Sequence, residues 1–270
     1  MAFDASCVSG ALVATGLRRV RVAGFARVPL SEGALVPSPT EPNLARPEEV
    51  RGALRELART LGGNGSPARL LLPDGVGRLA LLDVPAGTDA DQFARFRLLQ
   101  NVPAATPCSV ASVRLGRGAL VGAAVRRSTL EEYENVAAEA GLAQDRVDLA
   151  PLAALLSLVR EARGSVVGVI LGDAAVSLAA IEGGRLRALR GRRRVPGADE
   201  PEWLRAEVER TAAMAGLAEP ATVHVVGSGV GALLPELART GFAARRAWGE
   251  AGSGLPEESA HFSWFGAALS

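Results

Sequence analysis

Glycines that follow an apolar strand are the residues of this chain best placed to do chemistry. The segment VHVVGSGVGA, residues 223–232, reads as a buried strand, a turn that contains Gly227, Ser228 and Gly229, and the start of a helix. Backbone N–H groups at a helix N-terminus can bind a nucleotide or another anion. A tight turn that needs glycine for its backbone conformation explains the same residues equally well. The third glycine and the acidic ribose partner of a Rossmann dinucleotide site are missing from the sequence.

A second candidate group lies in the first turn of two similar segments. Residues 3–29 and 170–196 each contain three apolar runs separated by two small-residue turns, and each ends in Val-Pro. This repetition predicts a fold made of two similar halves. ATP-using proteins of duplicated design place an acidic residue and a glycine in the first turn of each half. Here the first turn has Asp4 but Ser6 in place of the glycine, and the second has Gly172 but an apolar residue in place of the acid.

These groups are too few for phosphoryl transfer. Such a site needs several groups that neutralise charge on the transferred phosphate, and the chain contains no lysine. A single Asp at a strand end more often caps a turn, which is our expectation for Asp4.

The remaining reactive side chains do not form a recognisable catalytic pattern. The two cysteines and two histidines have no metal-ligand spacing, so a metal site is not expected. His224 lies in an apolar strand and is expected to be structural. The arginines at positions 190 and 192–194 are expected to line a solvated strand edge, with contact to an acidic partner or phosphate as the less favoured alternative. We therefore expect no enzymatic activity.

Composition and charge limit the partners. The net charge of +1 argues against a nucleic-acid partner. The N-terminus lacks the basic and apolar regions of a secretory signal. No uninterrupted apolar run reaches the roughly 18 residues of a membrane span. The sequence therefore predicts a cytoplasmic protein with no direct membrane span.

The elements that must position these residues are of the α/β class. A helix is predicted from Pro47 to Gly62, after a Ser-, Pro- and Gly-rich loop. Residues 68–162 are predicted to form a compact α+β insertion that starts with a strand pair joined at Asp74-Gly75. The second segment is followed by one helix, the strand at 222–227, another helix and a short C-terminal helix.

Together these segments resemble the actin-like PilM family of type IV pilus assembly proteins, relatives of FtsA and of the cytoplasmic domain of GspL. The similar stretches run along nearly the whole chain: residues 3–36, RPEEVRGALRELARTLG (46–62), residues 70–107, RRSTLEEYENVAAEAGLAQDRVDLAPLAAL (126–155) and VHVVGSGVGALLPEL (223–237). The resemblance implies an actin-like fold of the ribonuclease H type, a duplicated βββαβα arrangement with an inserted subdomain. It divides the chain into a first lobe (1–67), the inserted subdomain of the FtsA 1C type (68–162), and a reduced second lobe with the C-terminal helix (163–270).

The chain also departs from the family pattern. The nucleotide cleft that the resemblance implies is vestigial; its members are Asp4, Ser6, Gly172, Gly227, Ser228 and Gly229. Residues 195–222 leave room for a single helix where the family has a whole upper subdomain, so we expect an open cleft. We expect a non-catalytic scaffold or adaptor that has lost nucleotide binding, and thus no cofactor, with bound ATP and Mg²⁺ as the alternative.

The resemblance further implies partners. Family members bind the N-terminal cytoplasmic peptide of a PilN-like inner-membrane protein and also contact an assembly ATPase. The partner-binding surface is expected at the strand pair around Leu72 and Leu82, because an extended peptide can add to a strand edge. The protein would then be cytoplasmic and peripheral to the inner membrane through its partner. Two further functions fit parts of this pattern: the cytoplasmic domain of a GspL-type secretion protein and a sugar-kinase-like phosphotransferase.

Overall fold

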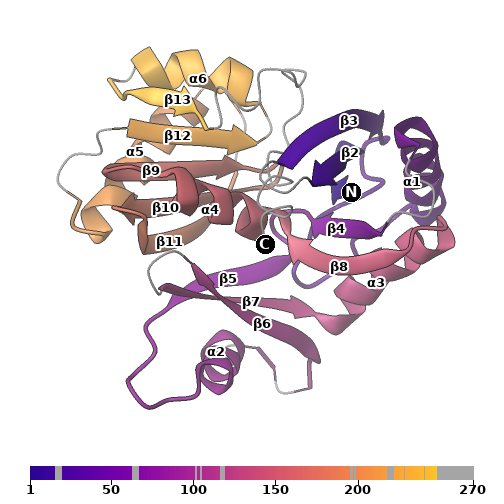
Figure 1. Cartoon of the computed structure of the whole chain (residues 1–270), viewed down its shortest axis with the longest axis horizontal. Helices are drawn as coiled ribbons and strands as arrows, with labels where there is room; N and C mark the ends of the chain where they lie inside the picture. The colour runs from indigo at the N-terminus through magenta and orange to yellow at the C-terminus, as the bar shows by residue number, and fades with distance from the viewer. Residues whose placement is uncertain are drawn as a thin grey trace.

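The computed structural model contains two five-stranded sheets and one three-stranded sheet (Figure 1). It describes residues 1–15, 20–62, 67–100, 102–103, 105–115, 119–194, 197, 199–217, 222–227, 229–239 and 241–247. Ser228, which was predicted to belong to the nucleotide cleft, and the predicted C-terminal helix lie outside these residues.

The first lobe is built on a sheet with strand order β3-β2-β1-β4-β8. Its strands are β1 (Ala2–Phe3), β2 (Cys7–Thr15), β3 (Val20–Pro29), β4 (Ala68–Leu72) and β8 (Gln144–Leu149). Helices α1 (Pro47–Leu61) and α3 (Arg127–Glu139) cover one face, where they share a core with Phe3 and Val8. The α1 stripe of Val50, Leu54 and Leu57 is buried, as its helical spacing predicts.

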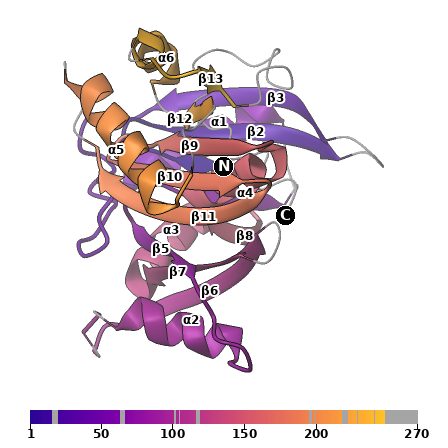
Figure 2. The same cartoon turned by 90° about the vertical axis from the view of Figure 1, so that its left-hand side faces the viewer.

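The second lobe repeats this plan in the order β11-β10-β9-β12-β13. Its strands are β9 (Ser165–Leu171), β10 (Ala175–Glu182), β11 (Arg185–Arg193), β12 (Thr222–Gly227) and β13 (Ala244–Arg246). Helices α5 (Glu200–Met214) and α6 (Val230–Arg239) pack on one face (Figure 2). In both sheets an antiparallel meander is followed by two parallel strands. The predicted duplicated α/β fold is therefore confirmed.

The inserted subdomain is smaller than the predicted span of residues 68–162. Its sheet has the order β5-β7-β6 and contains β5 (Gly77–Leu82), β6 (Cys108–Leu115) and β7 (Ala119–Arg126), with α2 (Ala90–Leu99) on the outer face. Strands β4 and β8 belong to the first lobe, because β4 hydrogen-bonds to β1 and β8 hydrogen-bonds to β4. The predicted hairpin between residues 68 and 85 is consequently wrong: the chain changes sheets at Asp74-Gly75.

Helix α4 (Ala150–Glu161) lies between the lobes. On one side Ala153 packs against Ala2 and Leu71 of the first sheet. On the other side Leu155 and Leu158 share a core with strands of the second sheet and with Leu115 and Val121 of the insertion. One helix therefore joins all three parts.

Between β11 and β12, α5 is the one helix that the described residues contain, as the sequence predicted. Within the described residues no helix is long and apolar enough to cross a membrane.

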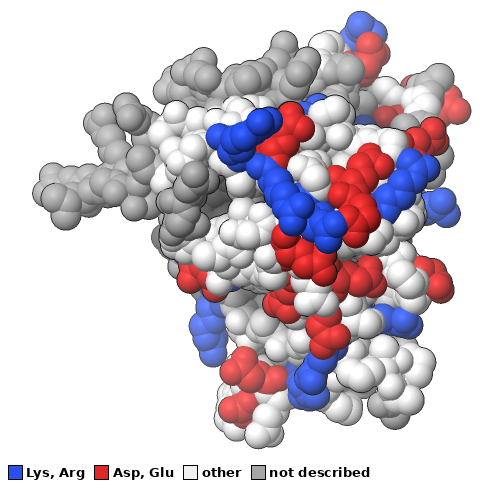
Figure 3. Space-filling model, turned by 90° about the vertical axis from the view of Figure 1, so that its right-hand side faces the viewer, with Lys and Arg blue, Asp and Glu red and all other residues white. Residues whose placement is uncertain are grey.

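The face formed by the first lobe carries basic and acidic side chains next to one another (Figure 3). Arg51 on α1, for example, pairs with Glu48 on the same helix and with Glu139 on α3. Neither sign dominates this face, in contrast to the basic surface of a typical nucleic-acid binder.

Candidate functional site

Three turns that the sequence singled out meet between the lobes. They follow β1, β9 and β12, whose ends lie together because the two sheets face each other across α4. Asp4, Gly172 and Gly227 line one small cavity there, together with Pro151 from α4. The structure thus brings three of the six predicted cleft residues, Asp4, Gly172 and Gly227, to one cavity.

The first turn is closed by its own residues. The Asp4 N–H donates to the carbonyl of Cys7 at 2.9 Å, and the Asp4 carboxylate accepts from the N–H of Ala5 at 3.0 Å. Asp4 is buried, with 5% of its surface exposed. This geometry agrees with the turn-capping role that we expected for it.

Ser6 ties the first turn directly to the second. Its hydroxyl donates to Asp173 Oδ2 at 3.0 Å, and Arg27 Nη2 donates to the same hydroxyl at 3.4 Å. Asp173 belongs to the turn between β9 and β10. Neighbouring Gly172 was predicted from the sequence and Asp173 was missed, although an acidic residue beside that glycine was a usable signal.

Arg194 holds the second turn against α5. Its Nη1 donates to the carbonyl of Gly172 at 2.9 Å, and its Nε donates to Glu200 Oε1 at 2.6 Å. Both side chains of the ion pair are about 10% exposed. A Cβ on Gly229 would lie 3.3 Å from Arg194 Nη2, so this guanidinium also adjoins the third turn. Arg194 was predicted to be a solvated edge residue, but its side chain is largely shielded from solvent and links the second turn to α5.

Gly227 is required by close packing. Its φ is +109°, and an added Cβ would lie 1.9 Å from the carbonyl oxygen of Leu171. A residue with a side chain does not fit there, so the glycine needs no ligand to explain it.

The two turns that correspond to the phosphate-binding turns of ATP-using proteins contact each other directly. The contact is the Ser6–Asp173 hydrogen bond. Asp4 and Asp173 place one carboxylate in each of these turns, and the chain contains no lysine. Among the described residues no group of three His, Cys, Asp or Glu side chains could hold a metal ion.

Asp74 is a further polar residue of the cleft, which the sequence placed only in a predicted hairpin turn. It follows β4, and its carboxylate accepts from Ser177 Oγ on β10 at 3.2 Å and from the N–H of Gly75 at 2.9 Å. Burial raises the pKa of Asp74 to about 6. The contact between Asp74 and Ser177 is thus a second hydrogen bond, beside that of Ser6 and Asp173, between the first half of the chain and the second lobe.

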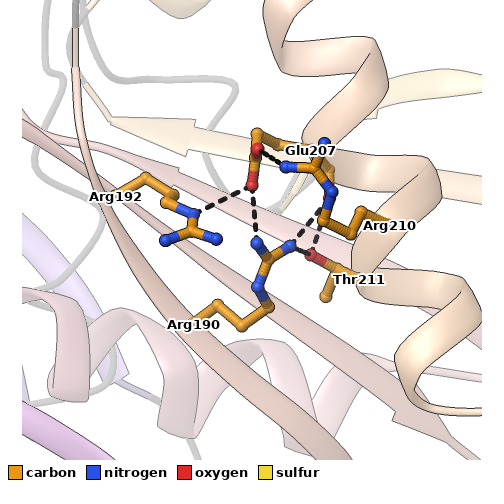
Figure 4. Close-up of polar contacts among 5 residues, drawn as sticks. All are labelled: Arg190, Arg192, Glu207, Arg210 and Thr211. Atoms are coloured by element: carbon orange, nitrogen blue, oxygen red, sulfur yellow. Dashed lines mark hydrogen bonds and ion pairs between the residues drawn. The ribbon is translucent and has the colours of Figure 1, made fainter.

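The arginine run of β11 has its acidic partner within the chain (Figure 4). Glu207 of α5 accepts from Arg190 Nη2 at 2.9 Å and from Arg192 Nε at 3.1 Å, and it also pairs with Arg210. These cations hold the pKa of Glu207 below its ordinary value, although its burial alone would raise it. Arg190 and Glu207 are buried, with side chains 9% and 7% exposed. The expectation of a purely solvated edge is corrected: β11 is an edge strand, but Arg190 anchors α5 to it.

The histidine and cysteine of the cleft region are structural. His224 is buried in β12 and accepts from Arg245 Nε at its Nε2, at 2.8 Å. Burial and the charge of Arg245 lower the pKa of His224 to about 4, so the ring is neutral near pH 7. Cys7 is a buried free thiol whose pKa is raised by burial.

The predicted partner-binding leucines are both in hydrophobic cores. Leu72 is 1% exposed in the first-lobe core, and Leu82 is 8% exposed under α2. Strand β4 is paired on both sides and offers no free edge. Addition of a peptide beside Leu72 is therefore ruled out, whereas β5, which carries Leu82, is an edge strand of its sheet and the expectation for that strand stays a prediction.

Comparisons with known proteins agree with this architecture. No protein-family model and no curated protein sequence matches the chain. Among solved structures, a PilM–PilN type IV pilus biogenesis complex matches with a TM-score of 0.71 at 17% identity, over 99% of this chain and 95% of that one. A Bacteroides thetaiotaomicron protein with an actin-like ATPase fold and unknown function matches with a TM-score of 0.54 at 12% identity, over 88% of this chain and 85% of that one. The cytoplasmic domain of EpsL, an inner membrane component of the type II secretion system of Vibrio cholerae, matches with a TM-score of 0.51 at 12% identity, over 84% of this chain and 79% of that one.

The chain therefore has an actin-like fold, the class that its two matching sheets and the cleft between them define. Within this class its fold is similar to that of the PilM–PilN complex structure over nearly its whole length. The expected resemblance to PilM is confirmed at the level of the fold.

Proposed function

We propose that this protein is a non-catalytic, actin-like adaptor of a type IV pilus-like assembly system. In this proposal it is cytoplasmic and is held at the inner membrane by the N-terminal cytoplasmic peptide of a PilN-like partner. The similarity to the PilM–PilN complex structure over 99% of the chain supports a role of this kind.

The observation that carries the non-catalytic part is the contact between Ser6 and Asp173. The chain uses its own hydrogen bond, at 3.0 Å, between the two turns that hold phosphate in ATP-using proteins of this design. We propose that nucleotide binding has been lost together with this space, and that the cleft now serves to fix the lobes.

Thermal unfolding in the presence of Mg-ATP tests this loss. A ligand at about 100 times its Kd stabilises the native state by about 2.7 kcal/mol, which raises the Tm of a chain of this size by several degrees. We expect no shift with about 5 mM Mg-ATP, a concentration that would saturate a site of about 50 µM Kd. A saturable shift of several degrees would establish the ATP-binding alternative instead.

The partner is tested separately with a synthetic N-terminal cytoplasmic peptide of a PilN-like membrane protein. We expect the full chain to bind that peptide with a Kd below about 100 µM. Phe96 on α2 is a large apolar side chain that is 61% exposed, which makes Phe96→Ser a suitable first variant for locating the contact on the insertion. Binding to an assembly ATPase is examined by the same assay with the purified enzyme.

A secretion role is the second candidate. The similarity to the cytoplasmic domain of EpsL supports it, with a lower TM-score of 0.51. Binding to a cytoplasmic segment of a type II secretion component, without binding to a PilN-like tail, would favour this alternative.

A further inference from the structure

Asp74 lies where three parts of the molecule meet. It follows β4 of the first lobe, at the point where the chain crosses to β5 of the insertion (Figure 1). Its carboxylate reaches β10 of the second lobe, where it accepts from Ser177 Oγ at 3.2 Å. An added Cβ on Gly172 would lie 3.0 Å from the Cβ of Asp74, so this side chain also packs against the second turn. One acidic side chain therefore contacts both sides of the boundary between the lobes.

Small cavities and a groove adjoin this carboxyl group. A cavity of about 30 Å³ lies between Asp74 and the turns that follow β1, β9 and β12. A second cavity of about 50 Å³ is lined by Asp74 together with Ser177 and Leu189. Asp74 also lines a groove of about 1050 Å³ between the loop of residues 30–39 and the end of β11. Each cavity is large enough for a water molecule, so the carboxyl group lies next to space that water can enter.

The hydrogen bonds of Asp74 satisfy only part of an ionised carboxylate. Its two oxygens accept one bond each, from the N–H of Gly75 at 2.9 Å and from Ser177 Oγ at 3.2 Å. A carboxylate can accept about four such bonds, whereas a protonated carboxyl group can also donate one. The contact between the lobes therefore suits the neutral form of Asp74 better than the charged form. The raised pKa of Asp74, about 6, agrees with this geometry, and burial is its main cause.

The charged groups around Asp74 do not provide it with a close counter-ion. The residues of α4, β8 and β12 that line the two cavities are uncharged. The charged side chains that line the cavities and the groove beside Asp74 are Asp4, Glu32, Asp173, Arg192 and Arg193. Arg192 is paired with Glu207, and Arg194, which binds the carbonyl of Gly172, is paired with Glu200. Ionisation of Asp74 thus adds a further negative charge beside the acids of the first two turns.

The lobes can separate at Asp74 while each sheet stays intact. The apolar contacts that join the two lobes centre on α4, which packs against the first sheet through Ala153 and against the second through Leu155 and Leu158. Each sheet keeps its own covering helices on its other face. The hydrogen bond between Ser6 and Asp173, near the groove, is exposed. A movement about α4 would therefore widen the groove without unfolding either lobe.

We propose that Asp74 and Ser177 form a proton-controlled latch between the lobes. Neutral Asp74 holds the lobes closed against Ser177, and ionised Asp74 releases them, so that water enters and the groove widens about α4. This proposal goes beyond the adaptor function, because it depends on residues of this chain alone and holds for any partner.

The sign of the effect follows from the raised pKa of Asp74 in the closed arrangement. The closed arrangement is favoured while Asp74 is protonated, and this preference is lost as the pH rises through about 6. With the ordinary pKa of 3.8 for the released carboxyl group, the ratio of open to closed molecules rises about tenfold between pH 5 and pH 8. The pKa of His224 is lowered to about 4, so this buried histidine titrates below the compared range.

Distances between spin labels on the two walls of the groove test the proposal on the full chain. Val36→Cys and Arg193→Cys supply the label sites at exposed residues, and the native Cys7 and Cys108 are buried. Double electron–electron resonance should show one main distance at about pH 5 and a larger population at a longer distance at about pH 8. Val36→Cys with Glu56→Cys, both exposed in the first lobe, is the control pair and should give the same distance at both pH values.

Two variants of the labelled protein assign the movement to the latch. Asp74→Asn cannot ionise and should keep the shorter distance at both pH values. Ser177→Ala removes a hydrogen bond that lowers the pKa of Asp74, so the change in distance should move to higher pH. This second variant keeps the proposal testable should Asp74→Asn fail to fold.

Two outcomes overturn the proposal. The first is an unchanged distance distribution between pH 5 and pH 8 in the labelled parent. A stability that falls with pH while the distance stays constant belongs to this outcome, because Asp74 would then be a buried acid between lobes that stay closed. The second is the same change of distance in Asp74→Asn, which would assign the movement to another group.

Discussion

Ser6 Oγ and Asp173 Oδ2 lie 3.0 Å apart although 167 positions separate them in the sequence. The two residues occupy equivalent turns of the two lobes, so their contact spans the symmetry of the fold. It follows that a hydrogen bond joins the two lobes at these turns.

The double-mutant cycle of Ser6→Ala and Asp173→Ala measures this connection. Because the bond is exposed, we expect a coupling energy of about 0.5–1 kcal/mol in urea unfolding. Ser6→Ala combined with Asp199→Ala is the control, since Asp199 is exposed and its side chain does not cap α5. Those two changes should add within about 0.5 kcal/mol. Full additivity in the first pair would mean that the interlobe bond contributes nothing in solution.

Glu207→Gln tests the ion cluster of α5. The change leaves the buried Arg190 without its carboxylate, so we expect a loss on the order of 3 kcal/mol in the free energy of unfolding. Glu209→Gln on the same helix removes an exposed pair with Arg205 and should cost less than about 0.5 kcal/mol. Similar losses in both variants would contradict the burial of the cluster.

Gly227→Ala separates packing from ligand binding. The new Cβ would overlap the carbonyl of Leu171, so the variant should lose more than about 2 kcal/mol without any ligand present. Gly191→Ala, where a Cβ meets open space, is the control and should stay within about 0.5 kcal/mol of the parent. A stable Gly227→Ala protein would show that the close approach relaxes.

Asp74 predicts a pH effect of known sign. Its pKa is raised from 3.8 to about 6, so the native state binds more protons than the unfolded chain between these values. This contribution to stability is complete below about pH 4 and is lost as the pH rises through about 6. Asp74→Asn should remove the effect and be more stable than the parent at pH 7.5, by on the order of 1 kcal/mol.

The difference in the free energy of unfolding between the parent and Asp74→Asn must be measured at each pH, because the titration of His224 affects stability in the opposite direction. Its pKa is lowered to about 4, so its contribution is lost as the pH falls from about 6.5 through 4. Ser177→Ala is the matched variant: it removes a donor that lowers the pKa of Asp74 and should move the Asp74 transition to higher pH. Identical pH profiles in all three proteins would contradict the role given to Asp74.

Local signals predicted the elements well. Helix α1 begins at Pro47 and is capped at its C-terminus by Gly62, as expected. Asp89 caps α2 by accepting from the N–H of Gln92 at 2.8 Å. The sequence Ser128–Glu131 has the pattern of a capping box but does not cap α3, because β7 passes directly into α3 and the N-cap is Arg126. Caps and turns depend on neighbours in sequence, which explains why most of them could be predicted.

Pairing between distant segments could not be predicted in the same way. The run of apolar residues at 68–72 fits a hairpin with residues 77–82 and a parallel neighbour of β1 equally well. Asp173 and Arg194 acquire their roles from partners on other elements, Ser6 and Glu200. The repeated pattern predicted the duplicated fold, but the contacts that distinguish this cleft arise only when the two halves meet.

The position of α4 affects how the molecule unfolds. Its residues share one core with both the second sheet and the insertion, and Ala153 contacts the first sheet. Loss of either sheet would expose one side of this helix to water. The three parts should therefore melt in a single cooperative transition, not as separate units, even though each sheet has its own strands and its own covering helices.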